Sequence, residues 1–436
     1  MRTTSPERPD SAALGQNDAG PDRAQPPRVI QGLADPGVLE TPDAYHHALS
    51  EAGIGFDPTL GFHVCGSYPL MREILRNTSV FSSVDSQRMD ALRPPPPAVA
   101  ALRHQALTPV NTLVTNDPPS HTRYRTLVDD PFRPRAIEAL TARIRDIAND
   151  TIDAFIDRGA CDAVTELAIP VPIQVIADLL GLPRTLAPDI KRWSDAAVEP
   201  LGMMVSDERL LECARQTLEF QACMVEALEA RRAAPRDDLL SHLAAARDND
   251  GKPLTMAEMV SLTQQFLVAG NETTTNAIAA GVQLLIENPD QYQLLQADPS
   301  PQRVRRFANE VLRLEAPVQG LFRIVREDTE IGGVKLTAGA RIMLRFAAAN
   351  RDARQFADPD RLDVDRHNTG THLGFGAGIH HCIGANLARE EMVQTFIVLL
   401  TRTRDLAFDG DRNDFRHHPS MILRGLKHLH VRFGLA

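Results

Sequence analysis

One cysteine, Cys382, lies in a glycine-rich stretch that could place its sulfur beside a metal or a substrate. The residues from Phe375 to Gly384 read FGAGIHHCIG, with two histidines directly before the cysteine. Glycines let a backbone take positive φ or pass close to a flat group. Helically spaced apolar residues follow, so free N–H groups and the helix dipole should favour a thiolate. Such a sulfur is a nucleophile, a metal ligand, or a buried cysteine in a glycine-rich turn.

A second group that could do chemistry lies inside a long apolar segment, FLVAGNETTTNAIAAG. There the run from Gly270 to Thr274 places the carboxyl group of Glu272 beside the hydroxyl of Thr273. A glycine costs a helix about 1 kcal/mol relative to alanine, so we expect a packing or functional reason for Gly270. Its missing side chain leaves room for a small ligand or a bulky flat group. A carboxylate beside a hydroxyl in an apolar core suggests a proton relay. A kinked helix with a buried, hydrogen-bonded glutamate explains the same residues.

Two further pairs of side chains share a helical face. Glu310 and Arg313 stand at i and i+3 and can form an ion pair. His121 and Arg125 stand at i and i+4, and two cationic groups on one face could hold a carboxylate or a phosphate. Because such pairs are also common on solvated helix faces, neither pair alone indicates a function.

The elements that must position these residues are mainly helical. Thr255 and Glu258 form a capping box that opens a helix able to run to Asn288, about 50 Å long. Apolar spacing and breakers predict further helices over 68–76, 134–155, 166–180, 206–232 and 301–315. Alternating segments predict strands within 56–65, 332–346 and 427–433. The predicted fold class is therefore mainly α with a minor antiparallel β portion.

Composition excludes several classes of protein. The chain has 436 residues, of which 43% are hydrophobic, and a net charge of −10 that argues against a general nucleic-acid binder. Its five cysteines lack CxxC spacing, which favours a reducing compartment without disulfides or a zinc ribbon. The longest apolar stretch, 167–182, is too short and too interrupted to span a membrane. We therefore expect a soluble, cytoplasmic protein without membrane insertion.

The N-terminal segment differs from the rest of the chain. Residues 1–30 carry many prolines and few apolar groups, and we expect them to form a disordered arm. Residues 31–436 are expected to form a single domain. Within that domain, 82–115 contains four consecutive prolines and no clean period, as in a lid, a binding loop or an exposed linker.

Taken together, these motifs resemble the cytochrome P-450 superfamily, the haem-thiolate monooxygenases, of the soluble bacterial kind. The stretch FGAGIHHCIG is similar to that family's haem-binding loop, and AGNETT is similar to its oxygen-activation motif. Glu310-x-x-Arg313 resembles the family's charge pair, and His121 with Arg125 resembles its propionate-binding helix. The motifs follow the family's order over roughly residues 35–436. The resemblance implies the cytochrome P-450 fold, with haem b between the long central helix and the cysteine loop.

The resemblance also implies a role for each site residue. Cys382 would be the proximal ligand of the haem iron, because a thiolate favours O–O cleavage. Thr273 would hydrogen-bond bound dioxygen, and Glu272 would help deliver protons. Other expected haem-binding residues are the propionate partners and those of the loop and central helix: His121, Arg125, Arg323, His380, Ala269, Gly270, Phe375, Gly376 and Gly384. His381 would be a surface or packing residue. The expected structural charge cluster consists of Glu310, Arg313 and Arg361.

The implied substrates are O2 and a moderately hydrophobic small organic molecule. Positions expected to line its pocket, which should be apolar, are Phe266, Val318, Leu321, Met421 and Ile422, with parts of 85–113 and 199–210. Gln265 is either a polar anchor for the substrate or a residue facing a neighbouring helix. Electrons would come from a ferredoxin-type donor with its reductase, since no flavin or iron–sulfur domain fits within the chain. The expected docking face for an acidic ferredoxin contains Arg123, Arg133, Arg135 and Arg389.

Three alternatives compete with this interpretation. A peroxide-dependent haem-thiolate enzyme would not need the pair of Glu272 and Thr273. A non-catalytic haem-binding sensor would have no reason to carry polar residues in its central helix. A zinc site built from His380, His381 and Cys382 would place adjacent ligands on a loop too tight for tetrahedral coordination.

Overall fold

The structure, a computed structural model, describes residues 28–88, 90 and 93–436. Its α-helices are α1 Pro36–Glu40, α2 Asp43–Ala52, α3 Tyr68–Arg76, α4 Pro97–Arg103, α5 Ser120–Val128, α6 Pro134–Asp153, α7 Pro170–Leu180, α8 Ala187–Val198, α9 Asp207–Ala233, α10 Leu239–Ala245, α11 Met256–Glu287, α12 Pro289–Ala297, α13 Pro301–Leu314, α14 Phe346–Ala349 and α15 Ala385–Arg402. Its strands are β1 Arg28–Val29, β2 Ile54–Asp57, β3 Phe62–Cys65, β4 Phe81–Ser82, β5 Ala160–Asp162, β6 Leu321–Val325, β7 Thr329–Ile331, β8 Val334–Leu336, β9 Arg341–Leu344, β10 Thr403–Phe408 and β11 His430–Leu435.

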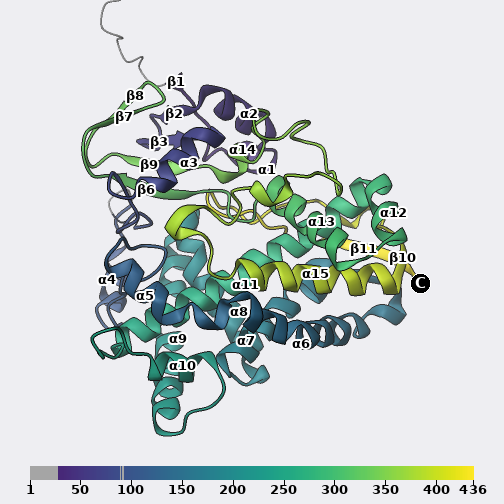
Figure 1. Ribbon diagram of the computed structural model, residues 1–436, viewed down its shortest axis with the longest axis horizontal. Coiled ribbons are helices and arrows are strands. Elements are labelled where there is room, and N and C mark those ends of the chain that lie inside the picture. The colour runs from purple at the N-terminus through teal and green to yellow at the C-terminus, as the bar shows by residue number, and fades with distance from the viewer. Residues whose placement is uncertain (1–27, 89, 91–92) are drawn as a thin grey trace, which may run out of the picture.

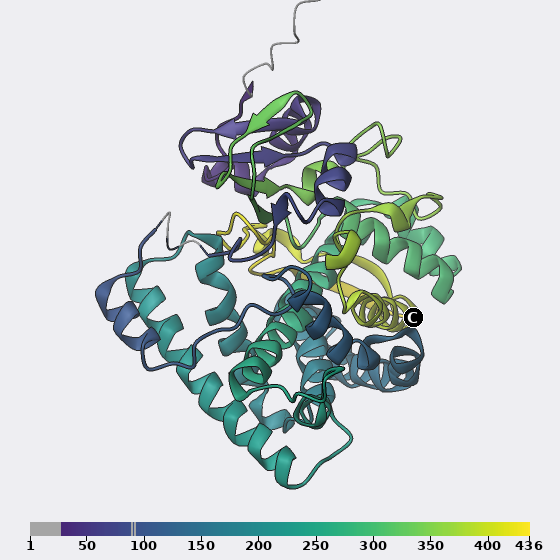
Figure 2. The ribbon, with the colours of Figure 1, turned by 60° about the vertical axis from the view of Figure 1, so that its left-hand side comes forward.

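The molecule has a strand-rich part and a larger helical part. Figures 1 and 2 show the sheet containing β2, β3 and β9 with α2, α3 and α14 in the upper part of the molecule, and α4 to α10 below. This sheet has the strand order β1-β2-β3-β9-β6-β4, and the others are β10-β11-β5 and β7-β8. The mainly helical class is confirmed. The pairings β1–β2 and β3–β9 are parallel, which the sequence analysis did not predict.

Helix α11 forms the centre of the helical part. It begins at the capping box, in which the Thr255 side chain accepts from the Glu258 N–H and the Glu258 side chain accepts from the Thr255 N–H. It contacts α7, α8, α9, α13 and α15, and most of its residues are buried. The predicted core helix is therefore confirmed. Its 32 residues give a length of about 48 Å.

Order begins earlier than predicted. Residues 28–30, which the sequence analysis assigned to the disordered arm, pair with β2, and the Ile30 N–H donates to the Phe56 carbonyl at 3.1 Å. The prediction is therefore wrong for these three residues. Such a short strand is stabilised by pairing with a neighbouring strand, and this pairing cannot be recognised from the local sequence. Residues 1–27, the rest of the predicted arm, lie outside the described residues.

The longest apolar stretch packs inside the protein. In the described part of the chain, one helical stretch, Ala163–Leu180, is long and apolar enough by composition to cross a membrane, and 61% of it is buried. It combines a π-helical turn, Ala163–Ala168, with α7, and both parts contact α11. Packing against the central helix accounts for its apolar character.

Candidate functional site

The cysteine loop is closed by its own backbone. The Cys382 N–H donates to the Phe375 carbonyl at 2.9 Å, and α15 begins three residues after the cysteine, with Gly384 as its N-cap. Gly376 and Gly378 have φ of +65° and +69°. A Cβ at residue 378 would lie 2.8 Å from the Leu75 carbonyl oxygen, at the end of α3. Glycine is therefore required there by both conformation and space.

The protein surroundings of Cys382 do not by themselves produce a thiolate. Burial raises the pKa of the Cys382 thiol, against the opposing effects of the Gly384 N–H and the guanidinium groups of Arg125 and Arg389. The Gly384 N–H at the helix start favours the thiolate, as expected, but desolvation is the larger effect. A coordinated metal deprotonates a thiol outright. A metal bound to Cys382 would therefore stabilise the thiolate form of its side chain.

Phe375 is held in place by a cation above its ring. The guanidinium carbon of Arg389 lies 4.5 Å from the Phe375 ring centroid, within the range of a cation–π contact. The Arg389 Nε also donates to Asn309 Oδ1 at 3.0 Å, which links α15 to α13. These contacts fix the aromatic ring at the start of the cysteine loop.

Three of the four predicted propionate partners lie together. The rings of His121 and His380 are 4.5 Å apart between centroids, and His380 Nε2 lies 3.1 Å from the Ser83 hydroxyl. Burial and the nearby Arg323 guanidinium lower the pKa of His380 to about 3, and burial also lowers the pKa of His121. At neutral pH both imidazoles are thus neutral hydrogen-bonding groups. The expectation that they are cations is wrong, because they are buried beside permanent cations.

The fourth predicted propionate partner, Arg125, also contacts the residue before Cys382. Arg125 Nη1 donates to the His381 carbonyl at 2.8 Å, and Arg125 Nε pairs with Asp129 at 3.3 Å. His381 itself is exposed, as predicted for a surface residue. Arg125 therefore ties α5 to the residue before Cys382.

The residues present fit a haem. Arg323 is 3% exposed, forms no ion pair among the described residues, and donates only to the neighbouring Phe322 carbonyl at 2.7 Å. Burial lowers the pKa of Arg323 to about 10, so it remains a cation at neutral pH. A buried, unpaired guanidinium costs free energy unless an anion joins it, and a haem propionate is such an anion. A thiolate-ligated haem needs a sulfur ligand for its iron and partners for its propionates. The cysteine loop provides the sulfur, and the buried Arg323 next to two imidazoles provides the partners.

The middle of α11 presents a small exposed face. Ala269 is exposed and Thr273 is half-buried, although most of this helix is buried. The Thr273 hydroxyl donates to the Ala269 carbonyl at 2.9 Å, one helical turn earlier. At Gly270 a packing reason is present, since a Cβ there would lie 3.1 Å from Cδ1 of Ile176 on α7. Its missing side chain makes room for this neighbouring helix.

Glu272 has a cationic partner that the sequence did not reveal. Lys191 Nζ lies 3.4 Å from Glu272 Oε2 and also pairs with Asp195 on α8. The two carboxylates raise the pKa of Lys191, although burial lowers it. Burial and the Glu272 charge raise the pKa of Asp195, against the opposing effect of Lys191. A chain of titratable groups therefore runs from α11 to α8.

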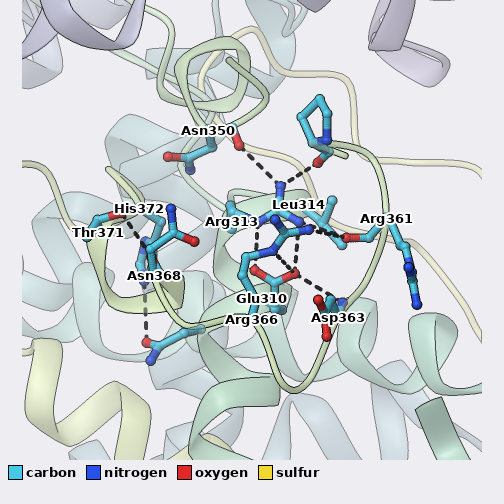
Figure 3. Close-up of polar contacts among 12 residues, drawn as sticks. Glu310, Arg313, Leu314, Asn350, Arg361, Asp363, Arg366, Asn368, Thr371 and His372 are labelled. Atoms are coloured by element: carbon cyan, nitrogen blue, oxygen red, sulfur yellow. Dashed lines mark hydrogen bonds and ion pairs between the residues drawn. The ribbon is translucent and has the colours of Figure 1, made fainter. Parts of the chain in front are cut away.

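The predicted charge cluster is present with one member changed. Glu310 and Arg313 are both 0% exposed, and two nitrogen–oxygen contacts of 2.7 and 2.9 Å join them. Figure 3 shows that Arg366, and not Arg361, supplies the second cation, with its Nε 3.0 Å from Glu310 Oε2. Arg361 contributes only its backbone carbonyl, which accepts from both arginines, while its side chain is exposed. The prediction of Arg361 is therefore wrong.

The predicted pocket residues fall into two groups. Leu321 packs against a cluster that contains Met421 and Ile422, and residues 201, 203 and 204 pack against the same cluster. Two hydrogen bonds hold the backbone at residues 421–422. The Gln319 N–H donates to the Ile422 carbonyl and Arg345 Nη1 donates to the Met421 carbonyl, both at 2.7 Å.

The other predicted pocket positions face different neighbours. Phe266 lies in the main core, 5.2 Å from Phe132 between ring centroids, and Val318 forms an isolated bridge with Leu423. Gln265 hydrogen-bonds Thr112 and the Val114 N–H, so it faces the 112–114 loop. The pocket assignments stay predictions.

Three of the four predicted docking arginines are already engaged. Arg123 pairs with Asp248 at 2.7 Å and with Glu258 at 2.8 Å, which fastens α5 to the start of α11. Arg389 lies over the Phe375 ring, as described above. Arg133 is 64% exposed and pairs with Asp129 at 3.3 Å and with Asp130 at 2.9 Å. Arg135 is exposed and forms no ion pair among the described residues.

The zinc alternative at the cysteine loop has no geometric support. In the part of the chain that the structure describes, three metal-ligating side chains converge only at Asp162, His428 and His430, outside this loop.

Comparison with known proteins gives one family. A model of the family described as Cytochrome P450 matches residues 195–300 and 303–429. The 6-deoxyerythronolide B hydroxylase of Saccharopolyspora erythraea is 37% identical over 318 residues, which are 73% of this chain and 77% of that protein. The vitamin D(3) 25-hydroxylase of Pseudonocardia autotrophica is 37% identical over 328 residues, which are 75% of this chain and 79% of that protein.

Solved structures agree with this result. The structure of cytochrome P450 CYP109Q5 from Chondromyces apiculatus superimposes with a TM-score of 0.81 at 36% identity, over 93% of this chain and 99% of that chain.

Proposed function

The chain belongs to the cytochrome P450 family, and we propose that it inserts one oxygen atom from O2 into a moderately hydrophobic small organic substrate, with electrons from a separate ferredoxin. Family membership makes it a monooxygenase whose cofactor is haem b. The observation that carries the proposal is the preformed cysteine loop beside the buried, unpaired Arg323. The hydroxylase names of the relatives, for a vitamin D and for 6-deoxyerythronolide B, support a substrate of this kind.

We assign haem binding to the residues around this loop. Cys382 would ligate the iron, Arg323 would pair with a propionate, and neutral His121 and His380 would hydrogen-bond the propionates. When bound through a thiolate, a haem supplies the oxidising chemistry, because the thiolate pushes electron density onto the iron and favours O–O cleavage. The protein's contribution is to hold that sulfur at a fixed position and to compensate the propionate charge.

Proton delivery would depend on α11 and α8. The Thr273 hydroxyl holds a proton at the exposed middle of α11 and keeps lone pairs that can accept a hydrogen bond. Glu272 lies next to it and pairs with Lys191, which also pairs with Asp195. These groups can pass protons toward the site, a function that a peroxide-dependent enzyme or a non-catalytic sensor would not need.

A cationic face around the cysteine loop supports the ferredoxin partner. Arg125 lies beside the loop, and Arg133 and Arg135 are exposed near the start of α6. Asp129 and Asp130 pair with Arg125 and Arg133 and compensate part of this charge. Complementary charge speeds the encounter with an acidic partner and weakens with added salt. We also propose a cytoplasmic location, because all five cysteines are unpaired in the structure.

Reconstituted turnover tests the proposal. Substrates are found by ligand-induced Soret shifts against terpenoids, fatty acids, aromatic acids and steroids. Each ligand is then incubated with the haem-loaded protein, a ferredoxin, its reductase, NAD(P)H and 18O2. One 18O atom per product molecule is expected. Turnover that requires hydrogen peroxide and ignores the ferredoxin would instead establish the peroxide-dependent alternative.

Replacing Thr273 by alanine should uncouple electron consumption from oxygenation. The variant loses the hydroxyl on the exposed face of α11, and product formed per NAD(P)H consumed should fall by about an order of magnitude or more. Thr273→Ser should keep most of the coupling. The control is Thr263→Ala, which loses a similar back-bond, 2.8 Å to the Met259 carbonyl, at a buried position of the same helix. Unchanged coupling in Thr273→Ala would remove this hydroxyl from the mechanism.

A further inference from the structure

The small sheet β10-β11-β5 carries a cluster of metal-ligating side chains that the oxygenase function does not use. Asp162 ends β5, His430 begins β11, and the two residues are direct cross-strand partners. His428 lies two residues before His430, and their rings are parallel within 2° with centroids 5.8 Å apart. One potential ligand atom from each of the three residues lies within 4.8 Å of the others.

The Asp162 carboxylate is held in place before any ion arrives. Its Oδ1 accepts from the Leu429 N–H at 2.8 Å and the Val164 N–H at 3.1 Å. Its Oδ2 accepts from the Thr165 hydroxyl at 3.0 Å and from His428 Nδ1 at 2.8 Å. Hydrogen bonds of this kind orient the ligands of protein metal sites.

The two histidines are able to act as ligands. The His430 ring nitrogens have no hydrogen-bond partner among the described residues, although the His430 backbone is fixed on both sides by Asn413. The His428 side chain is 59% exposed and can rotate. Asp162 and His430 also line a hollow that would give an ion access from solvent. Side chains on paired strands would need only small movements to converge.

We propose that Asp162, His428 and His430 form a zinc site that fastens β5 to β11. Two imidazoles and one carboxylate are a ligand set that zinc accepts, with water as the fourth ligand. In a tetrahedral site with bonds of about 2.0–2.1 Å, ligand atoms are about 3.3 Å apart. The ion would replace the proton shared by His428 Nδ1 and Asp162 Oδ2. The distance between these two atoms would then increase from 2.8 Å by about 0.5 Å. Imidazole nitrogens select zinc over magnesium or calcium.

The surrounding charges are compatible with a cation. Two arginines line the hollow, Arg158, which pairs with Glu166, and Arg412, which pairs with Asp409 at 2.9 Å. Their charges are therefore compensated. Because β5 and β11 belong to distant parts of the chain, an ion bound to both strands would stabilise the folded state by linkage.

Zinc titration of the haem-loaded full-length protein tests the site. The protein is first stripped of adventitious metal with EDTA and dialysed, and zinc binding is followed by calorimetry and by metal analysis after gel filtration. One zinc per chain is expected, together with a rise in melting temperature that saturates at that stoichiometry. Magnesium should give neither effect. Absence of stoichiometric zinc binding would overturn the proposal.

Matched variants separate this site from other surface histidines. His428→Gln and His430→Gln should each weaken zinc binding by about tenfold or more and remove the rise in melting temperature. The control is His47→Gln, which removes a similar histidine–carboxylate pair, 3.1 Å between His47 Nε2 and Asp360 Oδ2; the adjacent His46 is buried. Its zinc binding should equal that of the wild type. Equal zinc affinity in His430→Gln and the wild type would also refute the site.

Discussion

Replacing Cys382 by serine should reduce oxygenation to the background rate while leaving the polypeptide folded. The Cys382 backbone closes the loop through its N–H to the Phe375 carbonyl, and serine keeps that hydrogen bond. Serine provides no thiolate to push electron density onto an iron. The measurement is product formation in the reconstituted system, with far-ultraviolet circular dichroism to establish that the fold persists.

The control for this prediction is Cys223→Ser. Cys223 is a half-buried free cysteine on α9, and removing its thiol should leave turnover within about twofold of the wild type, as for a substitution away from any site. Substantial product formation by Cys382→Ser would show that another residue holds the reactive group. Loss of activity in Cys223→Ser as well would point to a general requirement for thiols.

Replacing Glu310 by alanine should destabilise the protein severely. The carboxylate is 0% exposed and is the only acidic partner of the buried Arg313 and Arg366 among the described residues. Removing one member of a buried ion pair costs about 3–5 kcal/mol, since the remaining charges stay buried. That cost is a large fraction of a typical folding free energy of about 5–15 kcal/mol. We expect low soluble yield, low haem content and a much lower melting temperature.

An exposed pair with the same spacing provides the control. Asp189 and Arg192 also stand at i and i+3 and lie 2.8 Å apart, but their side chains are 39% and 37% exposed. Asp189→Ala should cost less than about 1 kcal/mol. Glu310→Gln keeps the shape of the side chain and should fall between the two. If Glu310→Ala unfolds within about 1 kcal/mol of the wild type, the cluster does not hold the fold together.

The parts of the structure that local signals determine were predicted well from the sequence. The capping box of Thr255 and Glu258, together with Pro289, predicts the bounds of α11 to within a residue. The Glu310–Arg313 pair follows from its spacing on one helix. The cysteine loop follows from its glycines, two of which take positive φ. Each of these features depends on residues close together in the chain.

The features that the sequence did not predict depend on distant segments. Lys191 reaches Glu272 from another helix, and no pattern in the sequence joins residues 81 positions apart. Arg361 and Arg366 lie in the same irregular segment, and only the path of its backbone decides which side chain turns inward. The charge states of His121 and His380 depend on burial and on a nearby guanidinium, that of Arg125 for His121 and that of Arg323 for His380. A count of basic residues in the sequence therefore overestimates the number of cations.

The binding of carbon monoxide to the reduced protein tests the central claim most directly. That claim is that Cys382 is the axial ligand of a haem, because it lies on a preformed loop beside a buried, unpaired cation. Addition of carbon monoxide to the dithionite-reduced protein should give the strongly red-shifted Soret band of a thiolate-ligated haem. A Soret band at the position typical of imidazole-ligated haem proteins would contradict the account.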